Sequence, residues 1–216
     1  MVSVYDVKPG FQKLLRPLVK LLARSGVTAN QVTIAAVLLS FGAGTWLAID
    51  RGTGFTLPGY VSGQAETVPQ ILLMIPGVLF IRMALNAIDG MLAREHHMKS
   101  RLGAILNEMG DVVSDAALYL PLAWVPVFDP LAVVLVVLLG IVVEMAGVVS
   151  VQIGSSRRYD GPMGKSDRAF ILGGLSLLLG LGVPLGDGVE LILWGIVLLE
   201  ILTIVQRSRK GLAECN

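Results

Sequence analysis

Cysteine and charge are both scarce in this chain. Its single cysteine, Cys215, lies near the C-terminal end, so an internal disulfide and a cysteine-built metal site are both excluded. Charged residues make up 15% of the 216 residues, whereas a soluble domain carries roughly a quarter. They are also clustered, which leaves long stretches with almost no charge. Both features indicate that a lipid bilayer is the solvent of most of the chain.

The apolar stretches predict an all-α, polytopic membrane protein with six transmembrane helices. Each is close to the ~20 residues that a bilayer core requires, and they are expected at about 30–49, 69–94, 101–127, 130–153, 168–185 and 188–206. The longest connection, 50–67, is rich in glycine and is expected to be an irregular loop. We expect no cleavable signal peptide, because the first long apolar run starts only near Val32.

Residues 1–29 are predicted to form a cytoplasmic amphipathic segment that precedes the membrane domain at 30–216. In a helix over 9–25, leucines can line one face and basic residues the other; they are Leu14, Leu15, Leu18, Leu21 and Leu22, with Lys13, Arg16, Lys20 and Arg24. Such a helix suits the interface of a membrane that contains anionic lipid. Packing against the helix bundle is the alternative, and both can hold together.

The distribution of lysine and arginine predicts the orientation. Basic residues gather before the first span, between the second and third, between the fourth and fifth, and after the sixth. The opposite loops contain only Arg51 beside acids such as Asp129 and Asp187. We therefore expect a multi-pass protein of the cell (inner, cytoplasmic) membrane with both termini and its active site in the cytoplasm.

One polar segment interrupts this apolar sequence, and it reads NAIDGMLAREHHMKSRLGAILNEMGDVVSD over 86–115. Asn86 and Asp89 share one face of their helix, and Gly103, Asn107, Asp111 and Asp115 recur every four residues in the next. The short turn between the helices makes them antiparallel neighbours, so these faces can meet. Carboxylates at membrane depth are costly unless they pair or hold a cation. Oxygen ligands suit Mg²⁺ or Mn²⁺, which phosphates usually help to bind, so a phosphate-bearing substrate is indicated.

The same segment resembles the signature of the CDP-alcohol phosphotransferases, D-x2-D-G-x2-A-R-x8-G-x3-D-x3-D. At that spacing the chain has Asn86, Asp89, Gly90, Ala93, Arg94, Gly103, Asn107 and Asp111. The stretch 28–33 and the six helices behind an amphipathic helix are also similar to the family, so the resemblance covers nearly the whole chain. It implies transfer of a phosphatidyl group from a CDP-linked lipid such as CDP-diacylglycerol to an acceptor alcohol in phospholipid biosynthesis, with release of CMP.

The resemblance also implies roles for individual residues. Asp111 stands where the family has its general base. The CDP-binding residues are expected to be Asp89, Gly90, Ala93, Arg94 and Gly103. The metal-binding residues are expected to be Asn86, Asp89, Asn107, Asp111 and Asp115, around two Mg²⁺ or Mn²⁺ ions. Members of the family often dimerise, so a homodimer is compatible with the resemblance, and no nucleic acid is involved.

Two residues depart from the family's pattern, since Asn86 and Asn107 replace aspartates. Each replacement removes a negative charge and should weaken metal binding. Our hypothesis is that Asp115, one turn beyond Asp111, supplies a further anionic oxygen. The alternative is a homologue without catalysis that binds lipid or nucleotide or serves as a partner subunit. A small transporter fits less well, because the charges gather at one membrane face.

Two further features call for partners or ligands. Arg82 lies in mid-helix on the face of Asn86 and requires a partner, for which the site's carboxylates, Glu144 and Glu200 are candidates. The loop 155–169 carries the expected acceptor-binding residues, Arg157, Arg158, Lys165 and Arg168. Positive-inside loop charge would explain their number equally well. The Gly-Pro-Met-Gly-Lys turn before a helix start could nevertheless hold an anion.

Overall fold

The computed structural model describes residues 4–50 and 70–215, and these ranges contain helices and no strand. The α-helices are α1 (Val4–Arg24), α2 (Ala29–Asp50), α3 (Met74–Glu95), α4 (Arg101–Tyr119), α5 (Pro130–Val149), α6 (Lys165–Gly180) and α7 (Gly188–Glu214). Short 3₁₀ turns lie at Gln70–Leu73, Leu120–Trp124 and Ser150–Ile153. The all-α prediction is confirmed for these residues. The expected irregular loop after residue 50 lies outside them.

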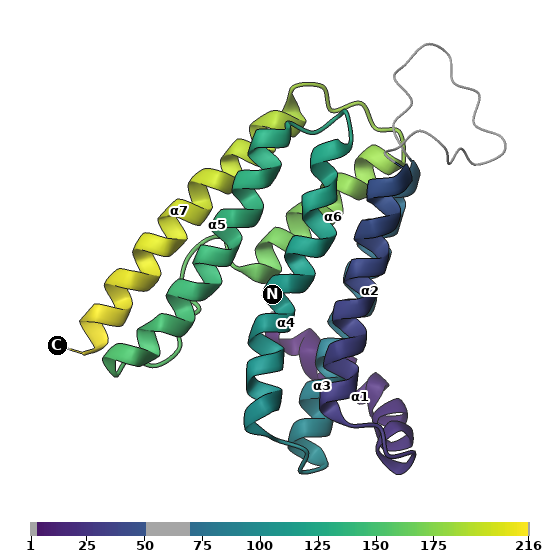
Figure 1. Ribbon diagram of the computed structural model, residues 1–216, viewed down its shortest axis with the longest axis vertical. Coiled ribbons are helices and arrows are strands. Elements are labelled where there is room, and N and C mark those ends of the chain that lie inside the picture. The colour runs from purple at the N-terminus through teal and green to yellow at the C-terminus, as the bar shows by residue number, and fades with distance from the viewer. Residues whose placement is uncertain (1–3, 51–69, 216) are drawn as a thin grey trace.

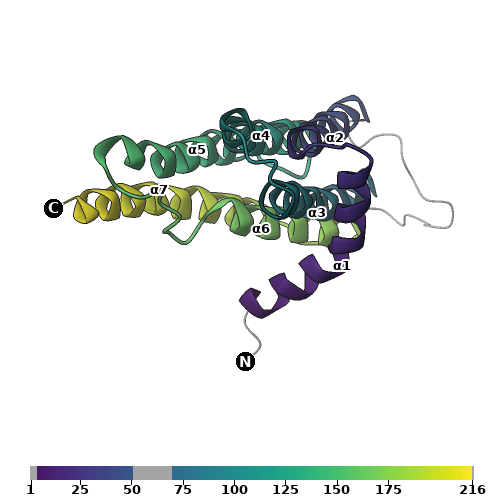
Figure 2. The ribbon, with the colours of Figure 1, turned by 90° about the horizontal axis from the view of Figure 1, so that it is seen from below.

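The long helices form two layers that run side by side (Figure 1). Seen along the bundle in Figure 2, α2, α4 and α5 make one row and α3, α6 and α7 make the other, while α1 crosses the end of α3. The helices α3, α4 and α6 therefore meet in the middle of the molecule. This arrangement brings the loop before α6 close to the segment 86–115.

Four helical segments are long and apolar enough to cross a membrane: Ala29–Asp50, Gln70–Glu95, Pro130–Ile153 and Gly188–Glu214. The other two expected spans correspond to α4 and α6, which carry the charged residues of the candidate site. The 16 residues of α6 reach about 24 Å at ~1.5 Å per residue, less than the ~30 Å of a bilayer core. The chain is an integral membrane protein, and the count of six spans stays a prediction.

Local capping explains several helix boundaries. Thr28 and Gln31 cap the start of α2 reciprocally, with the Thr28 amide donating to Gln31 Oε1 at 2.9 Å and the Gln31 amide donating to Thr28 Oγ1 at 3.3 Å. Asp129 accepts from the Leu131 amide at 3.0 Å ahead of Pro130, which opens α5. The third expected span, 101–127, ends its α-helix at Tyr119 because Pro121 cannot continue the amide hydrogen-bond pattern.

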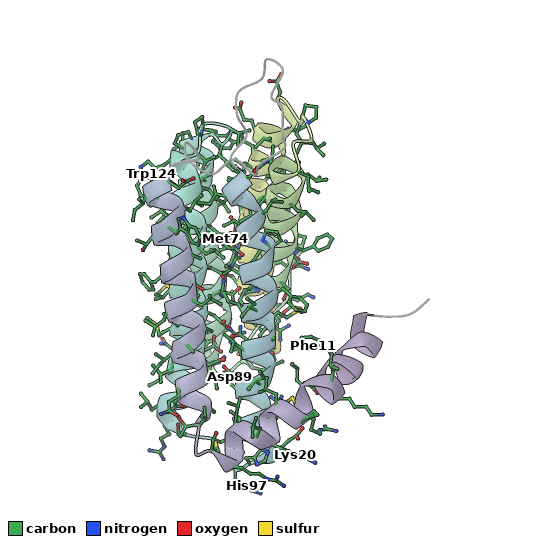
Figure 3. All side chains as sticks on the ribbon, turned by 90° about the vertical axis from the view of Figure 1, so that its right-hand side faces the viewer. Phe11, Lys20, Met74, Asp89, His97 and Trp124 are labelled. Carbon is green, nitrogen blue, oxygen red and sulfur yellow. The ribbon has the colours of Figure 1, made fainter. Side chains whose placement is uncertain are left out.

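The N-terminal helix α1 divides its predicted leucine face between the bundle and the outside. Leu15 and Leu22 pack with buried Val19 against a cluster formed by α2 and α3, whereas Leu14, Leu18 and Leu21 are exposed. Figure 3 shows α1 running outward from the end of the bundle that carries His97. Some leucines of α1 thus contact the bundle, and the others are exposed and could contact lipid. The interfacial position itself stays a prediction.

A close contact between α2 and α4 fixes the spacing of one layer. A Cβ atom added to Gly44 would lie 1.9 Å from the carbonyl oxygen of Ala117. A backbone carbonyl cannot move aside as the end of a flexible side chain can. Only glycine at position 44 therefore allows α2 and α4 to approach this closely.

We predict that Gly44→Ala destabilises the protein by roughly 1–3 kcal/mol, as overpacking of a tight interface does. Unfolding in detergent should show a lower midpoint than wild type. Gly42→Ala is the matched control on the same helix, because its added Cβ meets nothing within 4 Å and alanine favours a helix by up to about 1 kcal/mol. Equal stability of the two variants would contradict the prediction.

Candidate active site

The polar residues of α3, α4 and α6 meet in two clusters one helical turn apart. The first cluster is Asn86, Asp111 and Lys165, and the second is Arg82, Asp115 and Arg168. The spacing follows from the helices themselves, since each pair is separated by three or four residues and so shares a face. Both clusters therefore contain one side chain from each of the three helices.

In the first cluster, Asp111 is held from two sides. Asn86 Nδ2 donates to Asp111 Oδ1 at 3.1 Å. The Lys165 ammonium donates to the other oxygen, Asp111 Oδ2. The Asp111 side chain is 19% exposed, so it can be reached from outside the bundle. The predicted general base thus lies where a substrate hydroxyl could approach it.

Asp89 lies beside this cluster on α3 and is 6% exposed. Figure 3 places it toward the end of the bundle marked by His97 and away from Met74 and Trp124. The Thr33 hydroxyl of α2 donates to Asp89 Oδ2 at 2.9 Å. Asp89 also interacts electrostatically with both Asp111 and Lys165. Thr33 was not among the expected site residues; its sequence signal was its place in the stretch 28–33, which is similar to the family.

The other expected CDP-binding residues surround the turn between α3 and α4. A Cβ added to Gly90 would lie 3.1 Å from the guanidinium of Arg94, so this exposed arginine folds over the glycine. A Cβ added to Gly103 would lie 2.7 Å from Asn30 Oδ1 of α2. Ala93 packs against the apolar cluster below α1. Glycine therefore keeps the polar groups of Arg94 and Asn30 close to the backbone at both positions.

The second cluster is a buried ion-pair triad. Arg82 Nη2 lies 2.8 Å from Asp115 Oδ1, and Arg168 Nη2 lies 3.4 Å from Asp115 Oδ2. Arg168 also lies 3.5 Å from Glu200 and 3.9 Å from Glu144. The partner that Arg82 required is thus Asp115. Arg168 reaches inward to these acids rather than lining the loop surface.

The donor set can be tested for its fit to a metal ion. Asp89 and Asp111 offer anionic oxygens, and Asn86 and the exposed Asn107 offer amide oxygens. The ammonium of Lys165 already binds Asp111 as a cation, so this carboxylate suits a positive ligand. These donors fit a hard ion that completes its coordination with substrate phosphates.

The hypothesis that Asp115 adds a third carboxylate agrees less well with the geometry. Among the described residues, no three histidine, cysteine, aspartate or glutamate side chains lie close enough together to hold a metal ion. Asp115 instead uses both oxygens for Arg82 and Arg168. In this arrangement it stabilises the bundle, because two guanidinium groups satisfy its charge.

The loop between α5 and α6 is tied down by ion pairs. Arg157 lies 2.5 Å from Glu108 of α4 and 3.4 Å from Glu144, and it stacks 4.2 Å from the ring centre of Tyr159. Arg158 pairs with Asp160 at 2.7 Å and with Glu214. The structure therefore brings Arg157, Lys165 and Arg168 to α4, whereas Arg158 faces the end of α7.

Further residues of the loop anchor were not found by sequence reasoning. Arg207 of α7 donates to the carbonyl oxygens of Val143 at 2.7 Å and of Asp160 at 3.1 Å. Lys210 donates to Asp160 at 2.8 Å and holds the pKa of the Asp160 carboxyl below its usual range. Asp160 thus keeps its charge and its two cationic partners at neutral pH. No local sequence signal predicts these contacts, because Asp160 lies in a charged loop and its partners on α7 are 47 and 50 residues away.

The apolar bundle defines an integral membrane protein, and a family comparison defines its class. The profile of the CDP-alcohol phosphatidyltransferase family matches residues 26–205 of the chain. The chain belongs to this family, as its polar segment predicted.

Among curated proteins, the chain is similar to the inner membrane protein YnbA of Escherichia coli (strain K12). The two are 42% identical over 215 residues, which cover 98% of this chain and 97% of that protein. A phosphatidylinositol phosphate synthase of Corynebacterium glutamicum is 26% identical over 96% of this chain and 87% of its own length.

Solved structures of a Mycobacterium tuberculosis phosphatidylinositol phosphate synthase share the fold. The crystal structure with CDP-DAG bound has a TM-score of 0.74 at 21% identity and covers 92% of this chain and 94% of that chain. The complex with manganese and citrate has a TM-score of 0.72 at 22% identity, over 91% and 88% of the respective chains.

We predict that Arg82→Gln lowers the free energy of unfolding by roughly 3 kcal/mol, because the buried Asp115 would keep only Arg168, which it shares with Glu144 and Glu200. The measurement is denaturant unfolding in detergent. Arg16→Gln is the control, since the Arg16–Glu95 pair is about half exposed at 47% and 37% and should contribute at most about 1 kcal/mol. Similar losses for both variants would argue against the buried triad.

Proposed function

We propose that the protein transfers a phosphatidyl or similar substituted phosphate group from a CDP-linked lipid, such as CDP-diacylglycerol, to an acceptor alcohol and releases CMP. The observation that carries the proposal is the position of Asp111, held by Asn86 and Lys165 beside Asp89. Family membership supports it, as do the CDP-DAG and manganese named for structures of the same fold.

In the proposed reaction, the acceptor hydroxyl gives its proton to Asp111 as its oxygen bonds to the β-phosphorus of the CDP-lipid. The bond from that phosphorus to the bridging oxygen breaks, and CMP leaves with the bond's electrons. Lys165 supports this role by position, because its ammonium donates to Asp111 Oδ2 and so fixes the orientation of the carboxylate. Phosphoryl transfer of this kind depends mainly on positioning and charge neutralisation.

The nucleotide is proposed to bind at the turn between α3 and α4. Gly90 and Gly103 let the polar groups of Arg94 and Asn30 lie close to the backbone, and the Arg94 guanidinium above Gly90 can take a diphosphate oxygen. Ala93 and Asp89 complete this expected set. The acceptor is proposed to approach from the loop that carries Arg157 and Lys165.

Mg²⁺ or Mn²⁺ is proposed to bind Asn86, Asp89, Asn107 and Asp111, where it would neutralise negative charge on the substrate diphosphate. Asp115 is proposed to position the helices and not to bind the metal ion, because both of its carboxylate oxygens already accept hydrogen bonds from Arg82 and Arg168. The expectation of two ions comes from the family resemblance and is retained as a prediction. We also propose that the site and both termini are cytoplasmic.

One observation favours the alternative of a homologue without catalysis. Asn86 and Asn107 leave the site with two carboxylates, and Lys165 already pairs with one of them. Such a protein would bind CDP-lipid without releasing CMP. Measuring both binding and CMP release separates these functions.

We predict that the purified protein with CDP-diacylglycerol, Mn²⁺ and a panel of acceptor alcohols releases CMP. Asp111→Asn should lower the rate by about 100-fold or more, as expected on loss of a general base, and removal of the ion with EDTA should abolish release. The measurement is CMP by chromatography, with the lipid product identified by mass spectrometry.

Asp187→Asn is the control, since this exposed aspartate lies at the start of α7, outside the site. Its rate should equal that of wild type. If no acceptor gives CMP above the Asp111→Asn level with either ion, the proposed function is wrong and the binding role remains.

A further inference from the structure

We infer that the acceptor alcohol carries no phosphate group of its own. This inference rests on the proposed function and specifies the second substrate of the reaction. The question is open at sequence level, where four basic residues around the loop 155–169 were expected to bind a polar or phosphate head. The structure bears on it through the partners of those basic side chains. An acceptor phosphate would need cations and amides that are free to receive it.

The guanidinium groups of the loop already have carboxylate partners. Arg157 Nη2 lies 2.5 Å from Glu108 and 3.4 Å from Glu144. Arg158 lies 2.7 Å from Asp160 and also binds Glu214. Neither arginine therefore brings an uncompensated charge to the acceptor side of the site.

The cations at the start of α6 are compensated in the same way. Lys165 binds Asp111, and Arg168 is shared among Asp115, Glu144 and Glu200. Together with their neighbours, seven basic and seven acidic side chains form three separate sets of ion pairs, and each set has as many basic as acidic members. The basic ones are Arg82, Arg157, Arg158, Lys165, Arg168, Arg207 and Lys210; the acidic ones are Glu108, Asp111, Asp115, Glu144, Asp160, Glu200 and Glu214. The formal charge of each set is therefore zero before any substrate binds.

Two amides of the Gly-Pro-Met-Gly-Lys turn are also engaged. The Gly164 amide donates to Asp167 Oδ2 at 2.9 Å, and the Met163 amide donates to Thr203 Oγ1 at 2.9 Å. Pro162 has no amide hydrogen. The protein's own Asp167 thus already occupies the Gly164 amide, which precedes the first residue of α6.

These contacts decide between the two kinds of acceptor. A phosphate dianion would have to compete with Glu108 for Arg157, and it would add negative charge beside ion pairs that are already balanced. Like charges placed together at an interface weaken binding. A neutral alcohol needs only hydrogen bonds, which paired guanidinium and carboxylate groups still offer through their remaining donors and lone pairs. The ion pairs thus select a neutral or zwitterionic alcohol, such as a polyol or an amino alcohol.

The test compares matched acceptors that differ by one phosphate: glycerol with glycerol 3-phosphate, inositol with inositol 1-phosphate, and serine with phosphoserine. Each is supplied at equal concentration to the full-length protein with CDP-diacylglycerol and Mn²⁺. We expect CMP release to be at least about tenfold faster with the unphosphorylated member of any pair that reacts. Faster release with the phosphorylated member overturns this inference alone. Release at the Asp111→Asn level with every acceptor overturns the proposed function instead.

A second experiment tests the physical basis. Glu108→Gln frees Arg157 from its nearest carboxylate, so the rate ratio of phosphorylated to unphosphorylated acceptor should rise by about tenfold. Inorganic phosphate should also inhibit this variant at lower concentrations than wild type.

Glu190→Gln, an exposed change at the start of α7, is the matched control and should leave both quantities unchanged. Misfolding of Glu108→Gln would lower the rates with both acceptors and would not raise their ratio. The unfolding midpoint in detergent reports such misfolding separately. An unchanged ratio and unchanged phosphate inhibition in folded Glu108→Gln overturn the inference.

Discussion

The carboxylates of Asp111 and Asp115 on α4 need positive or hydrogen-bonding partners on both sides, and the packing of the three central helices follows from that need. A carboxylate placed inside a bundle in lipid is costly unless its charge is compensated. Arg82 and Asn86 of α3 provide this on one side, and Lys165 and Arg168 of α6 provide it on the other. Because each cluster joins three helices, their relative rotation and height are fixed together.

The two clusters have different tasks despite their similar design. The second cluster is buried and has two guanidinium groups around one carboxylate, so it is suited to hold the helices in register. The first has a partly exposed carboxylate with one ammonium and one amide partner. Reduced burial lets substrate approach, and the rigid cluster one turn deeper keeps the Asp111 side chain in place. The loop that closes this side is anchored in turn by Arg207 and Lys210 of α7.

Much of this organisation was predictable from local sequence. Helix-forming apolar runs, the caps at Thr28 and Asp129 and the four-residue spacing of Asp111 and Asp115 follow from rules that act within a few residues. The partner of Arg82 was predictable only as one of several acids, since the side chains that could reach it come from different helices. The contact of Thr33 with Asp89 and that of Glu108 with Arg157 were not predicted. A sequence does not give the rotation of one helix against another, and that rotation decides which side chains meet.

The sequence by itself determined the class of protein. Its apolar runs can be solvated only by lipid, and its family signature lies within two neighbouring helices, where spacing alone fixes which side chains share a face. Only the tertiary structure decided how the charges are paired. Residues from α5, the following loop, α6 and α7 meet across the bundle, and at distances of a few ångströms their packing determines which cation neutralises which acid. The four basic residues near the loop could equally have been a free anion site, and the helix packing made them a balanced set of ion pairs.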